Sequence, residues 1–168
     1  YISKDKLLLP NDAFGQHIAS SERFDDELDW GIIHEEAAKY YANIVMPYGS
    51  QVGKALESVK NLDIDIIAPS HGIIWRSHVK DIIKQYQTWC QNKSEEKALI
   101  IYDTMWGSTK KMAYALSQGI QEAGVPFSLL NLQTNHISDI ITEVLNAKLI
   151  LLGSPTLNNT MLPKMGGF

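Results

Sequence analysis

Apolar residues at helical spacing dominate the first half of the chain. Over residues 33–46 they recur every three or four positions, which predicts a helix with one apolar face. Pro47 interrupts this spacing, which resumes over residues 50–62, and the same spacing over 77–90 predicts a third helix. Two further apolar runs, at residues 1–9 and 63–69, predict strands. We therefore expect the first half to mix helices with short strands.

The pattern changes after residue 97 to a strict alternation of strands and helices. Apolar runs predict strands at residues 98–103, 127–132 and 148–155, and apolar spacing predicts helices at 108–123 and 137–145. Apolar strands separated by helices are typical of a parallel sheet covered on both faces. An all-polar stretch at residues 91–97, "QNKSEEK", lies between the two patterns. We place a domain boundary in it, which gives domains of residues 1–92 and 93–168.

Composition and charge exclude several classes of protein. The 168 residues carry a formal net charge of -4, with a pI near 5.7, and no cluster of Lys and Arg marks a nucleic-acid-binding surface. No apolar run approaches the roughly 18 residues that a membrane-spanning helix needs. The single cysteine, Cys90, rules out an internal disulfide and fits a reducing compartment. We expect a cytoplasmic protein that binds neither nucleic acid nor membrane.

The stretch "YDTMWGSTKKMA", residues 102–113, joins a predicted strand to a predicted helix. Thr104, Ser108 and Thr109 supply hydroxyl groups, and Gly107 lets the backbone turn closely around a ligand. Backbone N–H groups at the start of the helix add donors and a partial positive charge, which suit a phosphate group. Neither a Walker A motif nor a GxGxxG motif is present. The alternative is that these residues only cap the helix.

Two polar segments of the first half each follow an apolar run. "NDAFGQH" contains Asp12, and "APSHGIIW" contains His71. Carboxylate and imidazole groups are ligands of iron and zinc, and a carboxylate can bridge two metal ions. The alternative is that Asp12 belongs to a polar turn and that His71 is a packed, hydrogen-bonded side chain. We expect solvated or capping roles for the other histidines near predicted helix starts, His34, His78 and His136.

Taken in order, these three motifs resemble those of the flavodiiron proteins, also called A-type flavoproteins. The family includes rubredoxin:oxygen oxidoreductases and oxidases of reduced coenzyme F420, and the resemblance covers essentially the whole chain. It implies the fold class α/β. The C-terminal part of a metallo-β-lactamase-like αββα domain would be followed by the N-terminal part of a flavodoxin-like, doubly wound parallel sheet.

The resemblance also implies roles for individual residues. Asp12 matches the carboxylate that bridges two non-haem iron ions, and His71 matches a histidine ligand. His17 matches a histidine that lines the catalytic pocket without binding iron. The loop that matches the FMN phosphate loop comprises Thr104, Met105, Trp106, Gly107, Ser108 and Thr109. The loop that matches the one packed on the flavin ring comprises Pro155, Thr156, Leu157, Asn158 and Asn159.

An activity follows from the resemblance. Flavodiiron proteins reduce O2 to water or NO to N2O, with electrons that pass from a donor such as rubredoxin or reduced F420 through FMN to the diiron site. Their head-to-tail homodimer brings the FMN of one subunit near the irons of the other. The family's His-x-Glu-x-Asp-His motif and third flavin loop are absent from these residues. We therefore expect an internal fragment of a longer enzyme, inactive in isolation.

Two other functions remain open. A metallo-β-lactamase-fold hydrolase with two zinc ions would use the same ligand types, but it gives no reason for a flavodoxin-like domain. A plain FMN electron carrier would use the second half of the chain and leave the first half as scaffold. Metal content, FMN content and the consumption of O2 or NO distinguish these hypotheses.

Overall fold

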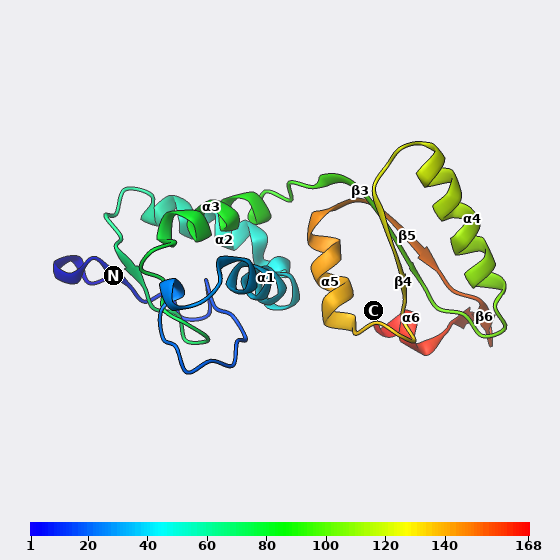
Figure 1. Ribbon diagram of the computed structural model, residues 1–168, viewed down its shortest axis with the longest axis horizontal. Coiled ribbons are helices and arrows are strands. Elements are labelled where there is room, and N and C mark those ends of the chain that lie inside the picture. Colours follow the sequence, from blue (N-terminus) through cyan, green and yellow to red (C-terminus); the bar gives the residue numbers. More distant parts are fainter. The chain divides into compact units, whose positions relative to one another are not determined.

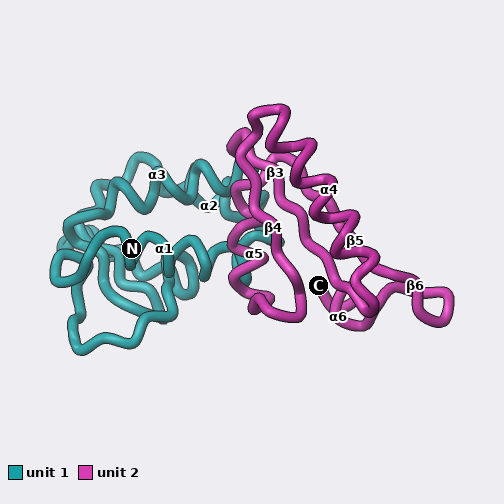
Figure 2. The backbone as a smooth tube through the Cα atoms, turned by 45° about the vertical axis from the view of Figure 1, so that its right-hand side comes forward, with its two compact units in different colours: residues 1–93 teal, residues 94–168 magenta.

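The computed structural model describes residues 1–168, and the chain divides into two compact units. Unit 1 comprises Tyr1–Lys93 and unit 2 comprises Ser94–Phe168 (Figure 2). Unit 1 is largely helical, whereas unit 2 is built on a three-stranded sheet (Figure 1). No helix combines the length and the apolar content that crossing a lipid bilayer requires.

Unit 1 contains three α-helices and several shorter helical turns. Its helical elements are η1 (Ser3–Asp5), η2 (Asp25–Glu27), α1 (Trp30–Tyr40), η3 (Tyr41–Val45), η4 (Met46–Tyr48), α2 (Gly49–Val59) and α3 (Val79–Cys90). The three α-helices lie where apolar spacing predicts them. The helix predicted over residues 33–46 is α-helical only as far as Tyr40 and continues as the π-helical turn η3. Pro47 lies in the 3-10 turn η4, where the first helical turn needs no N–H donor.

The strands of unit 1 are shorter than predicted. The strands β1 (Leu7–Leu8) and β2 (Ile66–Ile67) pair in parallel, and Ile67 also forms an isolated antiparallel bridge with Trp75. The strand predicted over residues 1–9 is wrong in its polar middle. There Lys6 adopts a left-handed conformation with φ of +48°, and its N–H donates to the Ser3 carbonyl to close η1. Apart from its helices, unit 1 therefore consists mostly of loops rather than strands.

A buried carboxylate fixes the start of α3. Asp25 is fully buried and accepts hydrogen bonds from the backbone N–H groups of Arg76, Ser77 and His78 at distances between 2.6 and 3.1 Å. A negative charge at this position also interacts favourably with the positive end of the helix dipole. The chain that follows His71 is thus held by a residue far away in the sequence.

The core of unit 1 is rich in aromatic side chains. Tyr41, Tyr86 and Trp89 are buried, and the ring centroid of Tyr86 lies 5.0 Å from that of Tyr41 and 5.4 Å from that of Trp89. Burial raises the pKa of Tyr41 to about 12. The Phe14 ring lies 4.3 Å from the Tyr86 ring, and the Phe14 N–H donates to the Tyr86 hydroxyl at 2.7 Å. The aromatic core therefore anchors the loop that contains Asp12.

Unit 2 contains a parallel sheet, as predicted. Its elements are β3 (Glu95–Tyr102), α4 (Ser108–Glu122), β4 (Phe127–Asn131), α5 (Ile137–Asn146), β5 (Ala147–Gly153), β6 (Thr156–Leu157), β7 (Thr160–Met161) and α6 (Pro163–Gly167). The strands β4, β3 and β5 lie side by side in that order, and all three are parallel. The central strand β3 is therefore paired on both sides.

The helices of unit 2 cover the two faces of this sheet. Side chains alternate along a strand, so neighbouring residues of β3 point to opposite faces. Ile100 and Tyr102 belong to a core cluster on the α4 side. Leu99 and Ile101 pack with Ile140 of α5 on the other side. Figure 1 shows α4 and α5 on opposite sides of the strands.

Two parts of unit 2 differ from the prediction. β3 begins at Glu95, inside the stretch predicted as a linker, because Glu95 pairs with Ala147 of β5. The segment after β5, predicted as a loop, contains the antiparallel hairpin of β6 and β7. Asn158 and Asn159 turn this hairpin with φ of +49° and +61°. Asn tolerates the left-handed conformation that such tight turns need, so the Asn–Asn pair was a usable signal.

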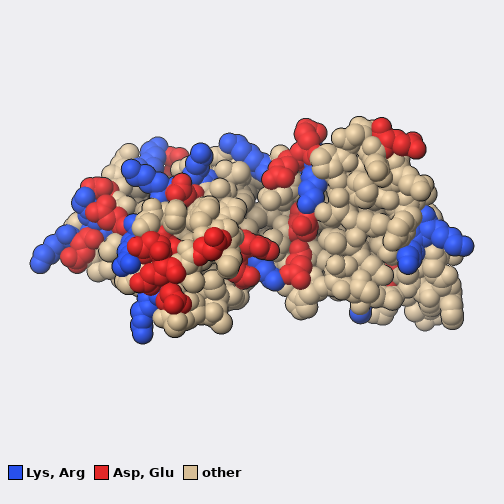
Figure 3. All heavy atoms as spheres, in the orientation of Figure 1, with Lys and Arg blue, Asp and Glu red and all other residues tan.

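The two units differ in their surfaces. On the face shown in Figure 3, charged side chains crowd unit 1 and are sparse over much of unit 2. Leu149 and Leu152 are exposed on the edge strand β5, and Met112 and Tyr114 are exposed on α4. Apolar residues on an edge strand favour packing against another segment of chain.

Candidate functional site

Two loops of unit 1 carry the residues predicted to bind metal. Residues 9–17 follow β1 and residues 68–75 follow β2, so both loops leave the same edge of the parallel pair. The Asn11 carbonyl accepts a hydrogen bond from the Ser70 N–H at 2.8 Å, and the Ser70 hydroxyl donates to the Asn11 side-chain oxygen at 2.9 Å. The two loops are thus joined next to the predicted ligands.

Asp12 and His71 face each other where the loops meet. His71 Nε2 lies 3.4 Å from Asp12 Oδ1, and the two side chains are 51% and 58% exposed, respectively. Two ligands about 2.0–2.1 Å from one tetrahedral ion lie about 3.4 Å apart, so the donor types and their separation suit a metal ion. Residues 1–168 contain no group of three or more His, Cys, Asp or Glu side chains that could hold an ion. The pair therefore fits part of a metal site.

Tyr40 lies at this site, although apolar spacing predicts only a core residue there. Its ring centroid lies 4.9 Å from the His17 ring and 6.1 Å from the His71 ring. Burial raises the pKa of the Tyr40 hydroxyl, and the negative charge of Asp12 raises it further. His17 is exposed, with its ring 6.0 Å from that of His71. The Tyr40 ring thus lies beside the two histidines, and its hydroxyl interacts electrostatically with Asp12.

The other histidines lie apart from this pair. His78 Nδ1 lies 3.2 Å from Asp81 Oδ2, and His136 caps α5 by accepting a hydrogen bond from the Ser138 N–H at 3.3 Å. For His34 the expected solvated or capping role is wrong. Its ring packs 5.4 Å from that of Trp30, and its Nε2 is buried without a hydrogen-bond partner.

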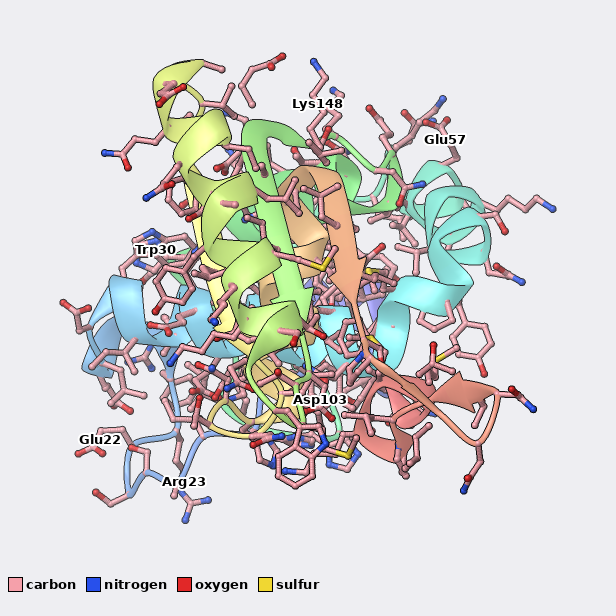
Figure 4. The ribbon with its side chains drawn as sticks, turned by 90° about the vertical axis from the view of Figure 1, so that its right-hand side faces the viewer. Glu22, Arg23, Trp30, Glu57, Asp103 and Lys148 are labelled. Carbon is pink, nitrogen blue, oxygen red and sulfur yellow. The ribbon has the colours of Figure 1, made fainter.

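The predicted phosphate loop lies between β3 and α4. Asp103, which Figure 4 shows at the end of β3, is buried and accepts hydrogen bonds from the Thr104 N–H and from Gln133 Nε2, both at 2.7 Å. Gly107 adopts φ of +86°, and its N–H donates to Thr104 Oγ1 at 3.0 Å. Asp103 therefore orients the loop as well as starting its turn, and Gln133, which the sequence did not single out, supports it.

The start of α4 offers free hydrogen-bond donors to a ligand. No side chain caps this helix, so the N–H groups of its first turn, which includes Ser108 and Thr109, have no capping partner. Ser108 is exposed, and Thr109 is mostly buried. Backbone donors at the positive end of a 15-residue helix form a site that suits a phosphate group. None of these side chains accepts a hydrogen bond from the first-turn N–H groups, although Thr104 accepts one from the N-cap residue Gly107.

The second predicted flavin loop starts at the same edge of the sheet. The Gly153 carbonyl accepts a hydrogen bond from the Asp103 N–H at 2.8 Å, and a Cβ at position 153 would lie only 3.1 Å from Thr109 Cγ2. Glycine thus lets the end of β5 approach the phosphate loop closely. Pro155 leads into the hairpin, and residues 156–159 form β6 and the turn before β7. The two predicted flavin loops are neighbours in space.

An open cavity adjoins the phosphate loop. Its volume is about 520 Å3, and it is lined by Asp103, Thr104, Met105, Gln133, Leu162, Pro163 and Lys164. Trp106 lies next to these residues in the sequence and is 86% exposed, so its indole ring is free to cover a ligand. The cavity lining combines apolar side chains with one hydroxyl group, one amide, one lysine and the Asp103 carboxylate, and the free backbone N–H groups lie beside it at the start of α4. An apolar cavity next to backbone donors suits a ligand that carries both a flat ring and a phosphate.

Comparisons with known proteins agree with this geometry. The Flavodoxin family profile matches residues 100–167. A nitric oxide reductase from Moorella thermoacetica is 52% identical over 165 residues, which cover 97% of this chain and 41% of that protein. This chain therefore spans about two fifths of the length of the relatives it matches.

Solved structures give the same result for the fold. The rubredoxin oxygen:oxidoreductase from Desulfovibrio gigas superposes with a TM-score of 0.95 and 36% identity, over 99% of this chain and 43% of that one. The flavodiiron protein from Giardia intestinalis superposes with a TM-score of 0.92 and 34% identity, over 98% of this chain and 41% of that one. The homologues and structural neighbours of this chain are thus flavodiiron proteins, and it matches them over nearly its whole length.

Proposed function

We propose that the complete protein is a flavodiiron oxidoreductase that reduces O2 to water, NO to N2O, or both, with electrons passed through FMN to a non-haem diiron site. One observation carries the proposal. A single chain presents the Asp12–His71 pair, 3.4 Å apart, in one unit and an uncapped phosphate loop in the next. The relatives named nitric oxide reductase and rubredoxin oxygen:oxidoreductase support the two substrates and the rubredoxin donor.

Asp12 and His71 would hold the iron. When bound, two iron ions supply the redox chemistry through which O2 or NO accepts electrons. Asp12 would contribute its carboxylate to the iron site, and His71 would contribute its imidazole. His17 would line the pocket, and the Tyr40 ring, which lies 4.9 Å from the His17 ring, would form another part of its wall. The remaining ligands would come from outside residues 1–168.

The two loops of unit 2 would hold FMN. When bound, FMN supplies the conversion of a two-electron input into single-electron steps. The N–H groups at the start of α4 and the hydroxyl groups of Thr104, Ser108 and Thr109 would bind its phosphate. Residues 155–159 would pack on the ring, and Trp106 would cover it. Lys164, which lines the adjoining cavity, would add a positive charge.

The proposal extends to domains, assembly and location. Residues 1–92 would belong to a metallo-β-lactamase-like domain and residues 93–168 to a flavodoxin-like domain. A head-to-tail homodimer would bring each FMN near the diiron site of the partner subunit. The donor would be rubredoxin or reduced F420, and the protein would act in the cytoplasm.

Turnover of the complete protein tests this function. The anaerobically reduced protein is supplied with reduced rubredoxin and then with O2 or NO, while O2 consumption and N2O formation are recorded. We expect one or both reactions, coupled to donor oxidation. If the FMN is reducible but neither reaction occurs, the protein is an electron carrier and the proposal is wrong. If the protein binds zinc, hydrolyses a substrate and shows no redox turnover, it is a hydrolase and the proposal is wrong.

A further inference from the structure

A buried amide joins the two loops that carry Asp12 and His71. Gln16 is fully buried. Its Nε2 donates a hydrogen bond to the Phe14 carbonyl at 3.0 Å, and its Oε1 accepts one from the Ile73 N–H at 2.8 Å. The backbone N–H of Gln16 also donates to the His71 carbonyl at 3.2 Å. One residue therefore contacts both loops through its side chain and its backbone.

Gly72 is shaped to receive this amide. A Cβ at position 72 would lie 2.0 Å from Gln16 Oε1 and 2.7 Å from the Gln16 carbonyl oxygen. Gly72 also adopts φ of +85°, which glycine tolerates without strain. The amide of Gln16 thus occupies the volume that any other residue at position 72 would fill. The residue after His71 and the side chain of Gln16 interlock.

The candidate ligands themselves have little to hold them. The side chains of Asp12 and His71 are more than half exposed, so the backbones of their loops set the separation between them. The hydrogen bonds between Asn11 and Ser70 also join the loops, but they are exposed to water.

Water competes much less with the buried bonds of Gln16. A second buried hydrogen bond joins the loops, from Trp75 Nε1 to the Phe14 carbonyl at 2.8 Å. Gln16 acts nearer to the candidate ligand, because it bonds both the His71 carbonyl and the Ile73 N–H.

We propose that Gln16 is a positioning residue that holds Asp12 and His71 at the separation needed to bind iron. This inference rests on the function proposed above. Ligands must stay within about 0.5 Å of their productive positions, and outer residues that orient them typically change metal affinity by about 10- to 100-fold. Gln16 touches neither metal nor substrate and acts through the His71 and Phe14 backbones.

The test replaces Gln16 in the complete protein. Gln16→Met keeps the length of the side chain and removes both side-chain hydrogen bonds. Gln16→Asn keeps the amide but is too short to reach both the Phe14 carbonyl and the Ile73 N–H, and it is the milder change for folding. Each variant is loaded with 57Fe. The rate of iron loss to a chelator, the Mössbauer spectrum without substrate and the FMN content are then measured.

A buried residue of α3 supplies the matched control. Ile82→Ala removes apolar volume from the core of unit 1 without removing any side-chain hydrogen bond. We expect both Gln16 variants to lose iron about 10- to 100-fold faster than the unchanged protein, with an altered Mössbauer spectrum and unchanged FMN content. Ile82→Ala should unfold at a lower temperature and keep the spectrum of the unchanged protein.

The outcomes separate this inference from the proposed function. An unchanged protein that binds no iron would overturn the proposed function and, with it, the inference. An unchanged protein that binds iron, with Gln16 variants that retain it equally well and give the same spectrum, would overturn the role of Gln16 alone. Iron loss from Ile82→Ala as fast as from the Gln16 variants would also overturn it, because the effect would then follow stability.

Discussion

In unit 2 the phosphate loop runs directly from β3 into α4, whereas in unit 1 the predicted metal ligands come from two separate loops. The phosphate loop is closed mainly by local hydrogen bonds, from the Thr104 N–H to Asp103 and from the Gly107 N–H to Thr104, and distant Gln133 adds bonds to Asp103 and Thr104. The Asp12–His71 pair depends on hydrogen bonds between distant residues, such as that from the Ile73 N–H to Gln16. The strands also differ, since β1 and β2 have two residues each and β3 has eight.

The two kinds of site should differ in how far the loss of one contact alters their shape. A loop built on a long strand and a helix can keep its shape when one contact is lost, because its neighbours along the chain still define it. A site formed by two loops depends on each tie between them. We therefore expect substitutions in unit 1 to have larger and more specific effects on bound metal than comparable substitutions in unit 2 have on FMN.

The largest effect is expected from Asp12→Ala in the complete protein. If Asp12 binds iron as proposed, removal of its carboxylate should lower iron affinity by more than the roughly 100-fold typical of outer residues, and turnover should disappear. FMN content should not change, because the phosphate loop lies in the other unit. Metal analysis, flavin absorbance and O2 or NO consumption measure the three quantities. Asp63→Ala, which removes an exposed carboxylate from unit 1, serves as control. If Asp12→Ala still turns over, Asp12 is not a ligand of the iron site.

Two glycines with nearly equal backbone angles provide a paired stability test. Gly72 has φ of +85° and Gly107 has φ of +86°. Gly107→Ala meets no atom within 4 Å, so it should cost only the left-handed strain of about 1–2 kcal/mol. Gly72→Ala also collides with Gln16, so its cost should reach about 2–5 kcal/mol. Denaturant unfolding of both variants gives the two free energies. Equal losses in the free energy of unfolding would mean that the close contact between Gly72 and Gln16 does not contribute to stability.

A moderate effect on FMN is expected from Thr104→Val. The substitution leaves the Gly107 N–H without its acceptor and removes a hydroxyl group from the phosphate site. A lost hydrogen bond of about 1–1.5 kcal/mol should raise the Kd for FMN by about tenfold, without changing the iron content. Quenching of FMN fluorescence on binding to the apoprotein measures the Kd. Thr88→Val removes a hydroxyl group from α3 and should leave the Kd unchanged. An unchanged Kd for Thr104→Val would argue against this phosphate site.

The smallest effect is expected at alkaline pH. Burial raises the pKa of Tyr41 to about 12, whereas an unfolded tyrosine releases its proton near pH 10. The folded state therefore binds this proton more tightly than the unfolded state. The contribution of the protonated Tyr41 to the free energy of unfolding is complete below about pH 10 and is lost as the pH rises towards 12. Tyr41→Phe should reduce this loss. Because the Tyr41 hydroxyl has no hydrogen-bond partner, the variant should lose little stability at pH 7. Thermal unfolding measured from pH 8 to 12 tests both points, and an equally steep loss in the variant would contradict the account.

Sequence alone predicted unit 2 better than unit 1. The strands β3, β4 and β5 and the helices between them follow from apolar runs and helical spacing, which are local signals. In unit 1 the helices followed for the same reason, but most of the predicted strand at residues 1–9 did not form. Its polar middle turns at Lys6, so that Ile2 pairs antiparallel with Leu7 instead of continuing into a single strand.

The candidate site could be predicted only in part. Asp12, His71 and the Thr104–Thr109 stretch were found from ligand chemistry and from the resemblance. The supporting residues Gln16, Tyr40 and Gln133 were not found, because each acts through contacts with a segment distant in the sequence. Helical spacing assigned Tyr40 to the core, and nothing in the sequence marks Gln16 as a buried amide. Such contacts exist only once the chain has folded.

The iron and FMN content of the complete protein tests the central claim most directly. We expect two iron ions and one FMN per chain, with the iron lost and the FMN retained in Asp12→Ala. One FMN per chain without iron, or zinc in place of iron, in protein expressed with sufficient iron would contradict it.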